Sequence, residues 1–550
     1  MINQITGECV VQAHPKDNEF NPLSIVNEAM NKAVSNQFGK LMDRHLLRDI
    51  INESTVINAT HFASGFLRFE IDFKSGQIAL KGFYLPAFIK LLTLMGFRKR
   101  YKKESNDYEF VHLENNIMEP VTVEQMKSRV HAALLSNTEK LIIEHNGARA
   151  EIEHGAIMDL FARQYTQVFN SGFAELLSSF NTPLLRDNKN ESYFLFANGV
   201  LTVTKDKIIL QDYSTLRNVA VWKSHIREKG FDFIEPTMDN CQYLKFLNNV
   251  SGRNTARLNA MFSAIGYLLH YYNHSSLGRG IILYDETLTD LQNPEGGTGK
   301  GIFLQAIEKV RETVIIDGKF IQENDRFKYQ KVNESTQVVA IEDLKANYPF
   351  ESFFSCLTNG WTIEKKNEKQ IKLSPEDSPK MLFTCNSILG GNGTSDARRQ
   401  FIIEFSDYYS TKLKKGILNP VEAEHGLLFK EDVWNEQDWN SFFSLMVKCT
   451  QLYLKNGLMP YERLNVERNK IIQRCGSEFA EWVSDKTFEK GKIYKTGDFF
   501  QEYKAIYYGD NSEYSQRSFT KSLKNYASIM GLQLACKRSN GETVFSLKVA

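Results

Sequence analysis

Between residues 280 and 405, short apolar runs alternate with stretches of helical periodicity. A helical pattern at residues 302–310 follows the first apolar run. The apolar runs cover residues 280–284, 313–317, 336–344 and 380–386. Runs without polar alternation are typical of parallel strands that are buried on both faces. This segment therefore predicts an α/β core around a parallel sheet.

The flanking segments have different patterns and predict further domains. Residues 1–140 combine an alternating strand pattern with a helical one, which indicates a mixed α/β domain. Residues 141–279 are mostly helical, with a strand-rich stretch at 193–213, so we expect a helical collar region with a small β-meander. The helical pattern at 432–459 predicts a lid that completes a unit at residues 280–475.

The last segment, residues 476–550, shows helices followed by a hairpin pattern. A helical pattern at 514–530 precedes two short strands around a turn at 539–541. This order resembles a winged helix. Such a domain would offer five basic residues to the phosphates of duplex DNA: Arg517, Lys521, Lys524, Lys537 and Arg538. The alternative is a compact domain that docks proteins.

Composition narrows the class of protein without indicating a chemistry. The chain has 550 residues, of which 42% are hydrophobic, and this excludes a wholly disordered protein. Its 67 basic and 66 acidic residues give a net charge of +1, which excludes coating of nucleic acid by bulk charge. No apolar run approaches the roughly 18 residues of a membrane span, and the seven cysteines include no CxxC pair. We therefore expect a cytoplasmic protein with no membrane partner.

A glycine-rich segment between the first strand and the first helix predicts phosphate binding. It consists of Pro294, Glu295, Gly296, Gly297, Thr298, Gly299, Lys300 and Gly301. Glycines let backbone N–H groups surround a phosphate, the lysine reaches the β- and γ-phosphates, and the next helix directs its positive end at them. Two positions depart from the usual pattern. Pro294 stands in place of a glycine, and Gly301 in place of the serine or threonine that binds Mg²⁺.

Three further positions complete the set expected for nucleotide hydrolysis. Glu342 and Asp343 end the run at 336–344, where one carboxylate would hold Mg²⁺ through water and the other polarise the attacking water. Asn386 ends the run at 380–386 and would orient that water or sense the γ-phosphate. Arg398 follows 12 residues later and would stabilise transition-state charge at a neighbouring subunit's γ-phosphate.

Residues 360–373 predict a basic hairpin. Lys365, Lys366 and Lys369 lie near a turn at Asn367. Lysines at a hairpin tip in a ring's channel would follow the phosphate backbone of single-stranded DNA without reading its sequence. The alternative is a solvated hairpin that contacts no DNA.

The order of these motifs resembles that of superfamily 3 helicases, the ring helicases of DNA viruses, phages and plasmids. The sequence runs that carry the resemblance are TGK, IEDL, NGWTIEKKNEKQIKL, FTCN and ARRQFIIEF. The resemblance implies an AAA+-type P-loop ATPase core of three α/β layers, assembled as a homo-hexamer. It makes Lys300 the Walker A lysine, Glu342 and Asp343 the Walker B acids and Asn386 the sensor. The pattern at 397–405 favours Arg398 as the arginine finger, with Arg399 as the alternative.

The resemblance implies an ATP-dependent DNA helicase that uses ATP and Mg²⁺. It would act on single-stranded and forked DNA during replication of a phage or mobile element, together with replication proteins of the host. No primase-type catalytic half is recognisable in the first 140 residues. Gly301 favours a second hypothesis, a hydrolysis-weak module that marks an origin or recruits replication proteins. A protein remodeller is the third.

Overall fold

The computed structural model describes most of the chain and divides it into two compact units. The described residues are 8–11, 59–72, 75–101, 107–136, 140–145, 148–276, 278–287, 297–345, 348–367, 370–386, 394–463, 465–489, 491–509, 513–539 and 542–549. The first unit contains Arg186–Gln211 and His225–Ala550, together with strand β1 (Glu8–Val11). The second contains Ala13–Leu185 and Asp212–Ser224.

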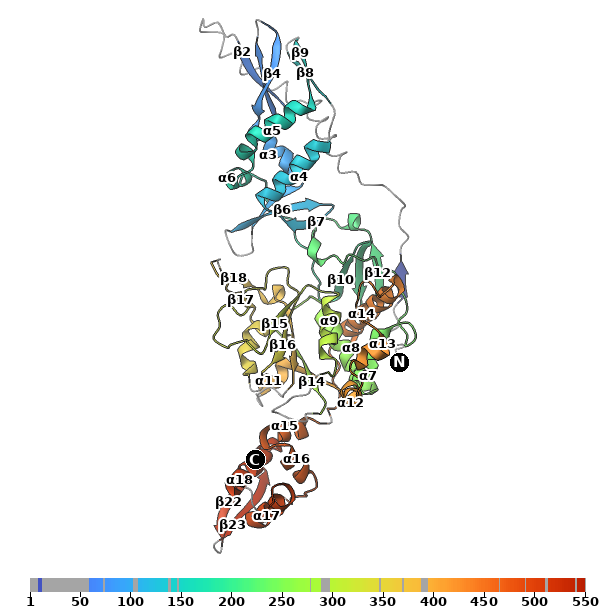
Figure 1. Ribbon diagram of the computed structural model, residues 1–550, viewed down its shortest axis with the longest axis vertical. Coiled ribbons are helices and arrows are strands. Elements are labelled where there is room, and N and C mark those ends of the chain that lie inside the picture. Colours follow the sequence, from blue (N-terminus) through green and yellow to red (C-terminus); the bar gives the residue numbers. More distant parts are fainter. Residues whose placement is uncertain are drawn as a thin grey trace. The chain divides into compact units, whose positions relative to one another are not determined.

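A parallel five-stranded sheet forms the centre of the first unit (Figure 1). In spatial order its strands are β15 (Thr313–Asp317), β16 (Val338–Leu344), β19 (Lys380–Cys385), β14 (Gly280–Asp285) and β20 (Gln400–Phe405). Every pairing is parallel, and β19 separates β14 from β16. The chain is therefore a multi-domain α/β protein with a parallel sheet, as the apolar runs predict.

Side chains of β14 alternate between two hydrophobic cores. Ile281 and Leu283 pack in a core with the helices on one face, whereas Ile282 and Tyr284 join a second core on the other face. The helices of the first core are α7 (Gln242–Val250), α8 (Thr255–Leu269), α9 (Lys300–Glu308) and α14 (Glu436–Asn456). Burial on both faces explains why this strand has no polar alternation.

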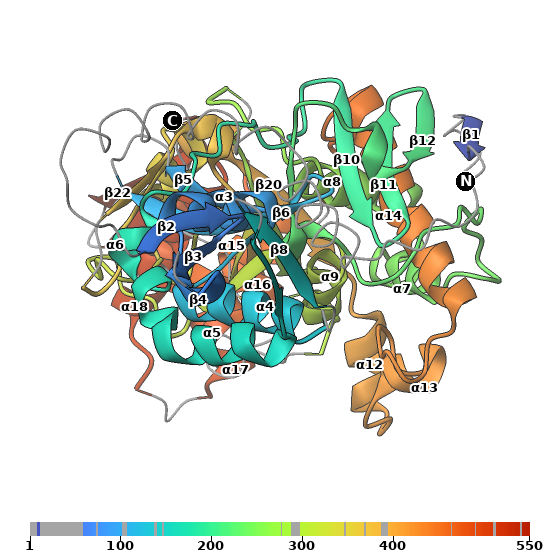
Figure 2. The same ribbon diagram turned by 90° about the horizontal axis from the view of Figure 1, so that it is seen from above.

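An antiparallel meander packs against α14 in the same unit (Figures 1 and 2). Its strands are β10 (Glu191–Phe196), β11 (Gly199–Thr204) and β12 (Lys207–Gln211), and β1 adds to β12 in parallel. Ala197 and Asn198 form the turn between β10 and β11, and Gly199 begins β11, in agreement with the predicted meander.

The second unit does not end at the predicted boundary after residue 140. Its helix α4 (Val123–Ser136) shares one core with α5 (His154–Val168) through Val130 and Leu160, among others. A boundary between these helices would expose that core to water. The unit also contains α3 (Leu85–Leu94), α6 (Ser171–Ala174), β8 (Leu141–His145) and β9 (Ala148–Ile152) and two sheets. One consists of β2 (Ala59–Ser64), β3 (Leu67–Asp72) and β4 (Gln77–Phe83), and the other of β5 (Phe97–Tyr101), β6 (Tyr108–Glu114), β7 (Ile117–Pro120) and β13 (Val221–Trp222).

The C-terminal part of the first unit has a hydrophobic core of its own, built around Phe479, Trp482, Phe519 and Phe545. We call residues 466–549 the C-terminal domain. Its helices are α15 (Val466–Cys475), α16 (Ser477–Ser484), α17 (Thr496–Tyr507) and α18 (Gln516–Ile529). The strands β21 (Tyr494–Lys495), β23 (Glu542–Val549) and β22 (Leu532–Ser539) form its sheet in that order. Because Ile471 and Ile472 of α15 belong to this core, the domain begins before residue 476.

No helix among the described residues is both long and apolar enough to cross a membrane. The cysteines Cys241, Cys356, Cys385 and Cys449 are buried free thiols. Burial raises the pKa of the Cys241 thiol to about 11, so this group stays protonated at neutral pH.

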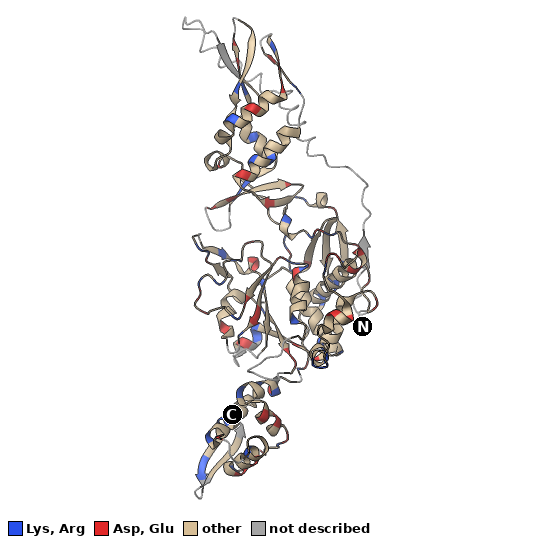
Figure 3. Cartoon of the chain, in the orientation of Figure 1, with Lys and Arg blue, Asp and Glu red and all other residues tan. Residues whose placement is uncertain are grey.

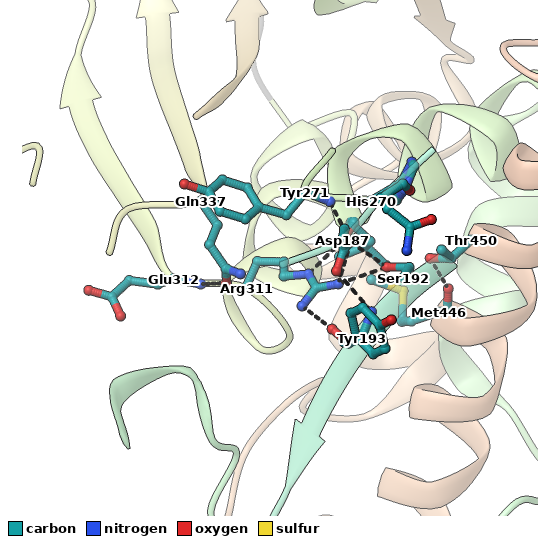
Figure 4. Close-up of polar contacts among 12 residues, drawn as sticks. Asp187, Ser192, Tyr193, His270, Tyr271, Arg311, Glu312, Gln337, Met446 and Thr450 are labelled. Carbon is teal, nitrogen blue, oxygen red and sulfur yellow. Dashed lines mark hydrogen bonds and ion pairs between the residues drawn. The ribbon is translucent and has the colours of Figure 1, made fainter. Parts of the chain in front are cut away.

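A buried polar network joins three segments of the first unit (Figure 4). Asp187 accepts hydrogen bonds from Ser192 Oγ at 2.6 Å and from the backbone N–H groups of Tyr193 and Tyr271 at 2.9 and 2.7 Å. Its Oδ2 lies 3.7 Å from Nη2 of Arg311, and both side chains are 4% exposed. A buried charge pair with this many hydrogen bonds specifies one arrangement of the segments that supply it.

Lys380, the first residue of β19, is buried beside this network, and its Nζ has no hydrogen-bond partner among the described residues. It is 1% exposed, and its Nζ lies 3.7 Å from the centre of the Tyr267 ring. Burial lowers the pKa of Lys380 to about 7, and the negative charge of Asp187 opposes the shift. An unfolded lysine titrates near pH 10.4, so between about pH 7 and 10 the unfolded chain binds more protons and folded stability rises with pH.

We predict that Lys380→Met stabilises the protein at pH 6, where the folded wild type must carry a buried charge. The gain corresponds to about 1.4 kcal/mol for each unit by which burial lowers the pKa, and it shrinks as the pH rises from 7 to 10. Thermal unfolding at pH 6, 8 and 10 measures it. Lys372→Met, at an exposed position, serves as the control. An equal gain at all three pH values would contradict the burial of a protonated lysine.

Candidate functional site

The glycine-rich loop leads directly into α9. Its described part begins at Gly297, and Pro294, Glu295 and Gly296 lie outside the described residues. Gly299 caps α9 with a φ of 102°, and a Cβ at this position would lie 2.8 Å from the Phe246 ring. Only glycine satisfies both the left-handed backbone and this close approach. Lys300 is therefore the first residue of the helix, at its positive end.

Lys300 forms a buried ion pair with Asp285, the last residue of β14. Its Nζ lies 2.6 Å from both Oδ1 and Oδ2 of Asp285, and Thr298 Oγ1 donates to Oδ1 at 2.6 Å. Lys300 and Asp285 are each 7% exposed. The positive charge that the loop offers to a phosphate is thus neutralised by a carboxylate of the same chain. The sequence analysis missed Asp285, although an acid after an apolar run is the signal that identified Glu342.

Strand alternation places Asp285 and Glu342 on the sheet face that α9 covers. Leu283 of β14 and Ala340 of β16 belong to the core that contains α9, and the two acids lie two residues further along each strand. A Cβ at Gly301 would lie 3.9 Å from Glu342 Oε1. Glu342 therefore faces the start of α9, where a serine or threonine side chain at position 301 would begin.

Asp343 lies in an irregularity at the end of β16 and has a different environment. Its φ is 52°, and the β16–β19 register shifts between Ile341 and Leu344. Its N–H donates to Thr384 Oγ1 at 2.9 Å, and its Oδ2 lies 3.0 Å from Lys319 Nζ. The two acids, which are adjacent in the sequence, therefore have different surroundings. Asp343 forms an ion pair with Lys319, whereas Glu342 faces the start of α9.

Asn386 lies at the same edge of the sheet. Leu283 pairs with Thr384, so Asn386 is level with Asp285 on the neighbouring strand and lies between the ends of β14 and β16. Burial raises the pKa of the adjacent Cys385 thiol; the Lys300 ammonium opposes this rise, and Asp343 and Asp285 add to it. Lys300, Asp285 and Asp343 therefore all lie close enough to the Cys385 thiol to affect its pKa.

Glu342 fits a metal-binding role better than Asp343. It forms no ion pair with any described residue, and its negative charge, after burial, helps to raise the pKa of Glu308. The described residues hold no group of three or more His, Cys, Asp or Glu suited to a metal ion. A Mg²⁺ ion beside Glu342 would therefore take its remaining ligands from water and phosphate oxygens, which Mg²⁺ readily does.

A cavity lies beside the Lys300–Asp285 pair. Asp285 and Thr298 line it on one side, and Ser410, Thr411 and Lys414 of helix α12 (Tyr408–Lys414) line it on another. Three acids, Asp285, Glu286 and Asp407, and one lysine are among its lining residues, so the cavity is polar and, apart from Lys414, negatively charged. The sequence analysis assigned no role to α12, because nothing in its pattern relates it to the loop.

The two candidate arginines lie at the amino ends of the parallel strands, whereas Lys300 lies at their carboxyl ends. Helix α11 (Thr394–Arg399) leads into β20, whose first residue, Gln400, pairs with Gly280 at the start of β14. Asp285 ends β14, about 17 Å further along the strand at ~3.3 Å per residue. The Arg399 guanidinium packs 4.4 Å from the Phe354 ring centre. Arg398 is exposed and forms no ion pair within the described ranges, so it is available to another molecule.

The predicted hairpin is present between β17 (Trp361–Ile363) and β18 (Ile371–Leu373). Trp361 and Ile363 anchor it in the second core of the sheet. Lys366 is exposed at the turn, Lys365 is half-buried, and Lys369 lies outside the described residues. The DNA-binding role of these lysines stays a prediction.

Comparisons with known proteins assign no family. No protein-family model matches the chain, and no curated protein matches it. Two solved structures, both titled as A-form apo structures of the NrS-1 C-terminal region, are similar with a TM-score of 0.34. They are 11% and 10% identical to this chain, cover 85% of it and are themselves covered over 98% and 99% of their length. A similarity this low carries no argument about function.

We predict that Asp285→Ala destabilises the protein by about 3–5 kcal/mol, because it leaves the Lys300 ammonium buried without its counter-charge. Adding Lys300→Met to that variant recovers part of the loss by removing the unpaired charge. Thermal unfolding of the wild type, both single variants and the double variant measures the coupling. Additive effects of the two substitutions would show that the pair does not contribute to folding.

Proposed function

We propose that this chain is an ATP-hydrolysing motor of the superfamily 3 helicase type, with an AAA+-type core, that moves on single-stranded DNA. One observation carries the proposal. The carboxyl ends of three neighbouring parallel strands bring Asp285 with Lys300, Asn386 and Glu342 to the N-terminal end of α9. A ligand that needs a cation, backbone N–H groups and a carboxylate in one place is a nucleoside triphosphate.

The chain's own residues divide the work of binding. A phosphate that enters the loop competes with Asp285 for Lys300, with help from the first N–H groups of α9. Transfer of the ammonium from the carboxylate to the phosphate leaves Asp285 without its counter-charge. Thr298 can then turn its hydroxyl from Asp285 toward the phosphate. Ser410, Thr411 and Lys414 of α12 line the cavity in which the rest of the nucleotide would lie, and Mg²⁺ or Lys414 would offset the nearby acids Glu286 and Asp407.

Glu342 and Asn386 act on the attacking water. Both lie on the α9 side of the sheet, at the ends of the neighbouring strands β16 and β19. Asn386 orients the water through its amide, and the Glu342 carboxylate polarises it or holds Mg²⁺ through a water ligand. Mg²⁺, when bound, neutralises charge on the phosphate oxygens.

Arg398 acts on a second subunit under this proposal. Its place at the amino ends of the strands, about 17 Å along the strand from Asp285, keeps it from its own chain's Lys300. A homo-hexameric ring would bring Arg398 of one subunit to the nucleotide of the next, so hydrolysis would depend on assembly. Single-stranded and forked DNA, and the host's replication proteins, are the partners expected for such a ring in a phage or mobile element.

Gly301 supports a second candidate function. Without a hydroxyl at this position, the chain lacks one direct ligand for Mg²⁺. A hydrolysis-weak module would bind ATP as a structural ligand and mark an origin or recruit replication proteins.

The rate of ATP hydrolysis with and without single-stranded DNA distinguishes these functions. We expect turnover that single-stranded DNA stimulates and that Lys300→Ala abolishes. Negligible turnover in the wild type would favour the binding module, and turnover indifferent to DNA would favour a protein remodeller. The Lys365→Ala/Lys366→Ala variant, which alters only the hairpin, should retain basal turnover and lose the stimulation.

Mixing two inactive variants tests whether Arg398 acts between subunits. We expect Arg398→Ala to lower turnover by roughly 10³-fold or more while each subunit still binds ATP. Lys300→Ala is inactive for the opposite reason, since it keeps the arginine and loses the phosphate site. A mixture of the two forms some interfaces with an intact lysine and an intact arginine, and turnover partly returns. A mixture as inactive as its components would contradict the assignment.

We predict that Gly301→Ser lowers the Mg²⁺ concentration needed for half-maximal turnover. The nearest described neighbour of a Cβ at this position is Glu342 Oε1 at 3.9 Å, so the hydroxyl enters open space beside the expected ion. Gly301→Ala is the matched control, because it adds the carbon without the oxygen. Titration of Mg²⁺ at fixed ATP measures the difference. An identical Mg²⁺ requirement for both variants would contradict a metal site at this position.

A further inference from the structure

The C-terminal domain carries a stretch of chain from which acidic residues are absent. Between residues 514 and 541 there are five basic residues and no acidic one. This stretch contains α18 and all of β22. Acidic residues of the same domain lie on α15, α16, α17 and β23, and α18 is the helix of this domain that carries none (Figure 3).

Helix α18 presents three of these cations on one exposed face. Phe519, Leu523 and Ala527 pack into the domain's interior. Arg517, Lys521 and Lys524 are exposed and follow each other at spacings of four and three residues, which places them along one side of the helix. Ser515 caps the helix by accepting from the N–H of Ser518, which fixes where this face begins.

One of the remaining two cations extends this surface onto β22. Lys537 and Arg538 are both exposed on this strand, which lies at the edge of the domain's sheet and packs against α18. As consecutive strand residues they point to opposite faces of the sheet, and Arg538 shares the face of Cys536. Burial raises the pKa of Cys536, and the Lys524 ammonium opposes that rise, so Lys524 lies near the face of β22 that carries Arg538. We call Arg517, Lys521, Lys524 and Arg538 the basic face.

Contacts among the described residues leave the basic face unpaired. None of its four cations forms an ion pair with a described residue, whereas Lys486 pairs with Glu502, and Lys492 lies 2.6 Å from Glu489, elsewhere in the domain. Four like charges in proximity repel each other, and an external polyanion relieves that repulsion.

We propose that the basic face binds the phosphate backbone of duplex DNA, with α18 in the major groove and the β22–β23 hairpin on an adjacent strand. The major groove, ~12 Å wide, admits an α-helix. The exposed side chains of α18 include no aromatic residue, which single-strand binding by base stacking would require. A protein partner would need an apolar centre to its interface, and the exposed positions of α18 are all polar or charged.

Binding of the full-length protein to a 20-base-pair duplex, without nucleotide, tests this proposal. We expect Lys521→Ala/Lys524→Ala to weaken binding about tenfold or more and to reduce the slope of log affinity against log salt by roughly 1–2, as two lost phosphate contacts require. The matched control, Lys486→Ala/Lys492→Ala, removes the same charge from paired lysines and should leave both quantities unchanged.

Single-stranded DNA of the same length separates this surface from the motor. The Lys521→Ala/Lys524→Ala variant should keep its affinity for the single strand and its ATP hydrolysis, since neither uses the basic face. An equal loss of duplex affinity in the variant and in its control would attribute the effect to net charge and would contradict a specific role of the basic face. Unchanged duplex affinity and salt slope in the variant would overturn the proposal and leave a protein-docking role.

Discussion

The ion pair between Lys300 and Asp285 is the interaction on which the candidate site depends. It joins the glycine-rich loop to the end of β14 at a place where each residue is 7% exposed. A pair this buried is stable only with good geometry and further hydrogen bonds, and Thr298 supplies one to Asp285. Because α9 begins at Lys300, the pair also determines where the positive end of the helix meets the sheet.

The order of the strands gives the other polar groups their places around that pair. With β19 between β14 and β16, Asn386 emerges between the lysine and Glu342. Because β20 is parallel to β14, the chain must return to the amino end of β14 before β20 begins, and Arg398 lies at that end. Under the proposed function, the order and parallel direction of the strands therefore explain two properties. They explain why one chain forms a nucleotide site, and why hydrolysis at that site needs Arg398 of a neighbouring chain.

Much of the sheet was predictable from the sequence because its strands are buried on both faces. The run at 380–386 becomes β19 (Lys380–Cys385), and the run at 336–344 becomes β16 (Val338–Leu344). The divergence of Glu342 and Asp343 was not predictable, since it depends on a register shift against another strand. The boundary after residue 140 was wrong because α4 and α5 share a core that no local pattern reveals. The hydrogen bond from Arg311 to the backbone oxygen of Tyr193 was not predictable for the same reason, because the two residues are 118 positions apart in the chain.

The nucleotide affinity of variants at Lys300 and Asp285 tests the central claim most directly. If a phosphate replaces Asp285 on Lys300, substitutions at the two positions act in opposite directions. Titration of an ATP analogue should show weaker binding to Lys300→Ala and tighter binding to Asp285→Asn than to the wild type, because the second change removes the competing carboxylate. Weaker binding to Asp285→Asn, or no change in either variant, would contradict a phosphate site at Lys300.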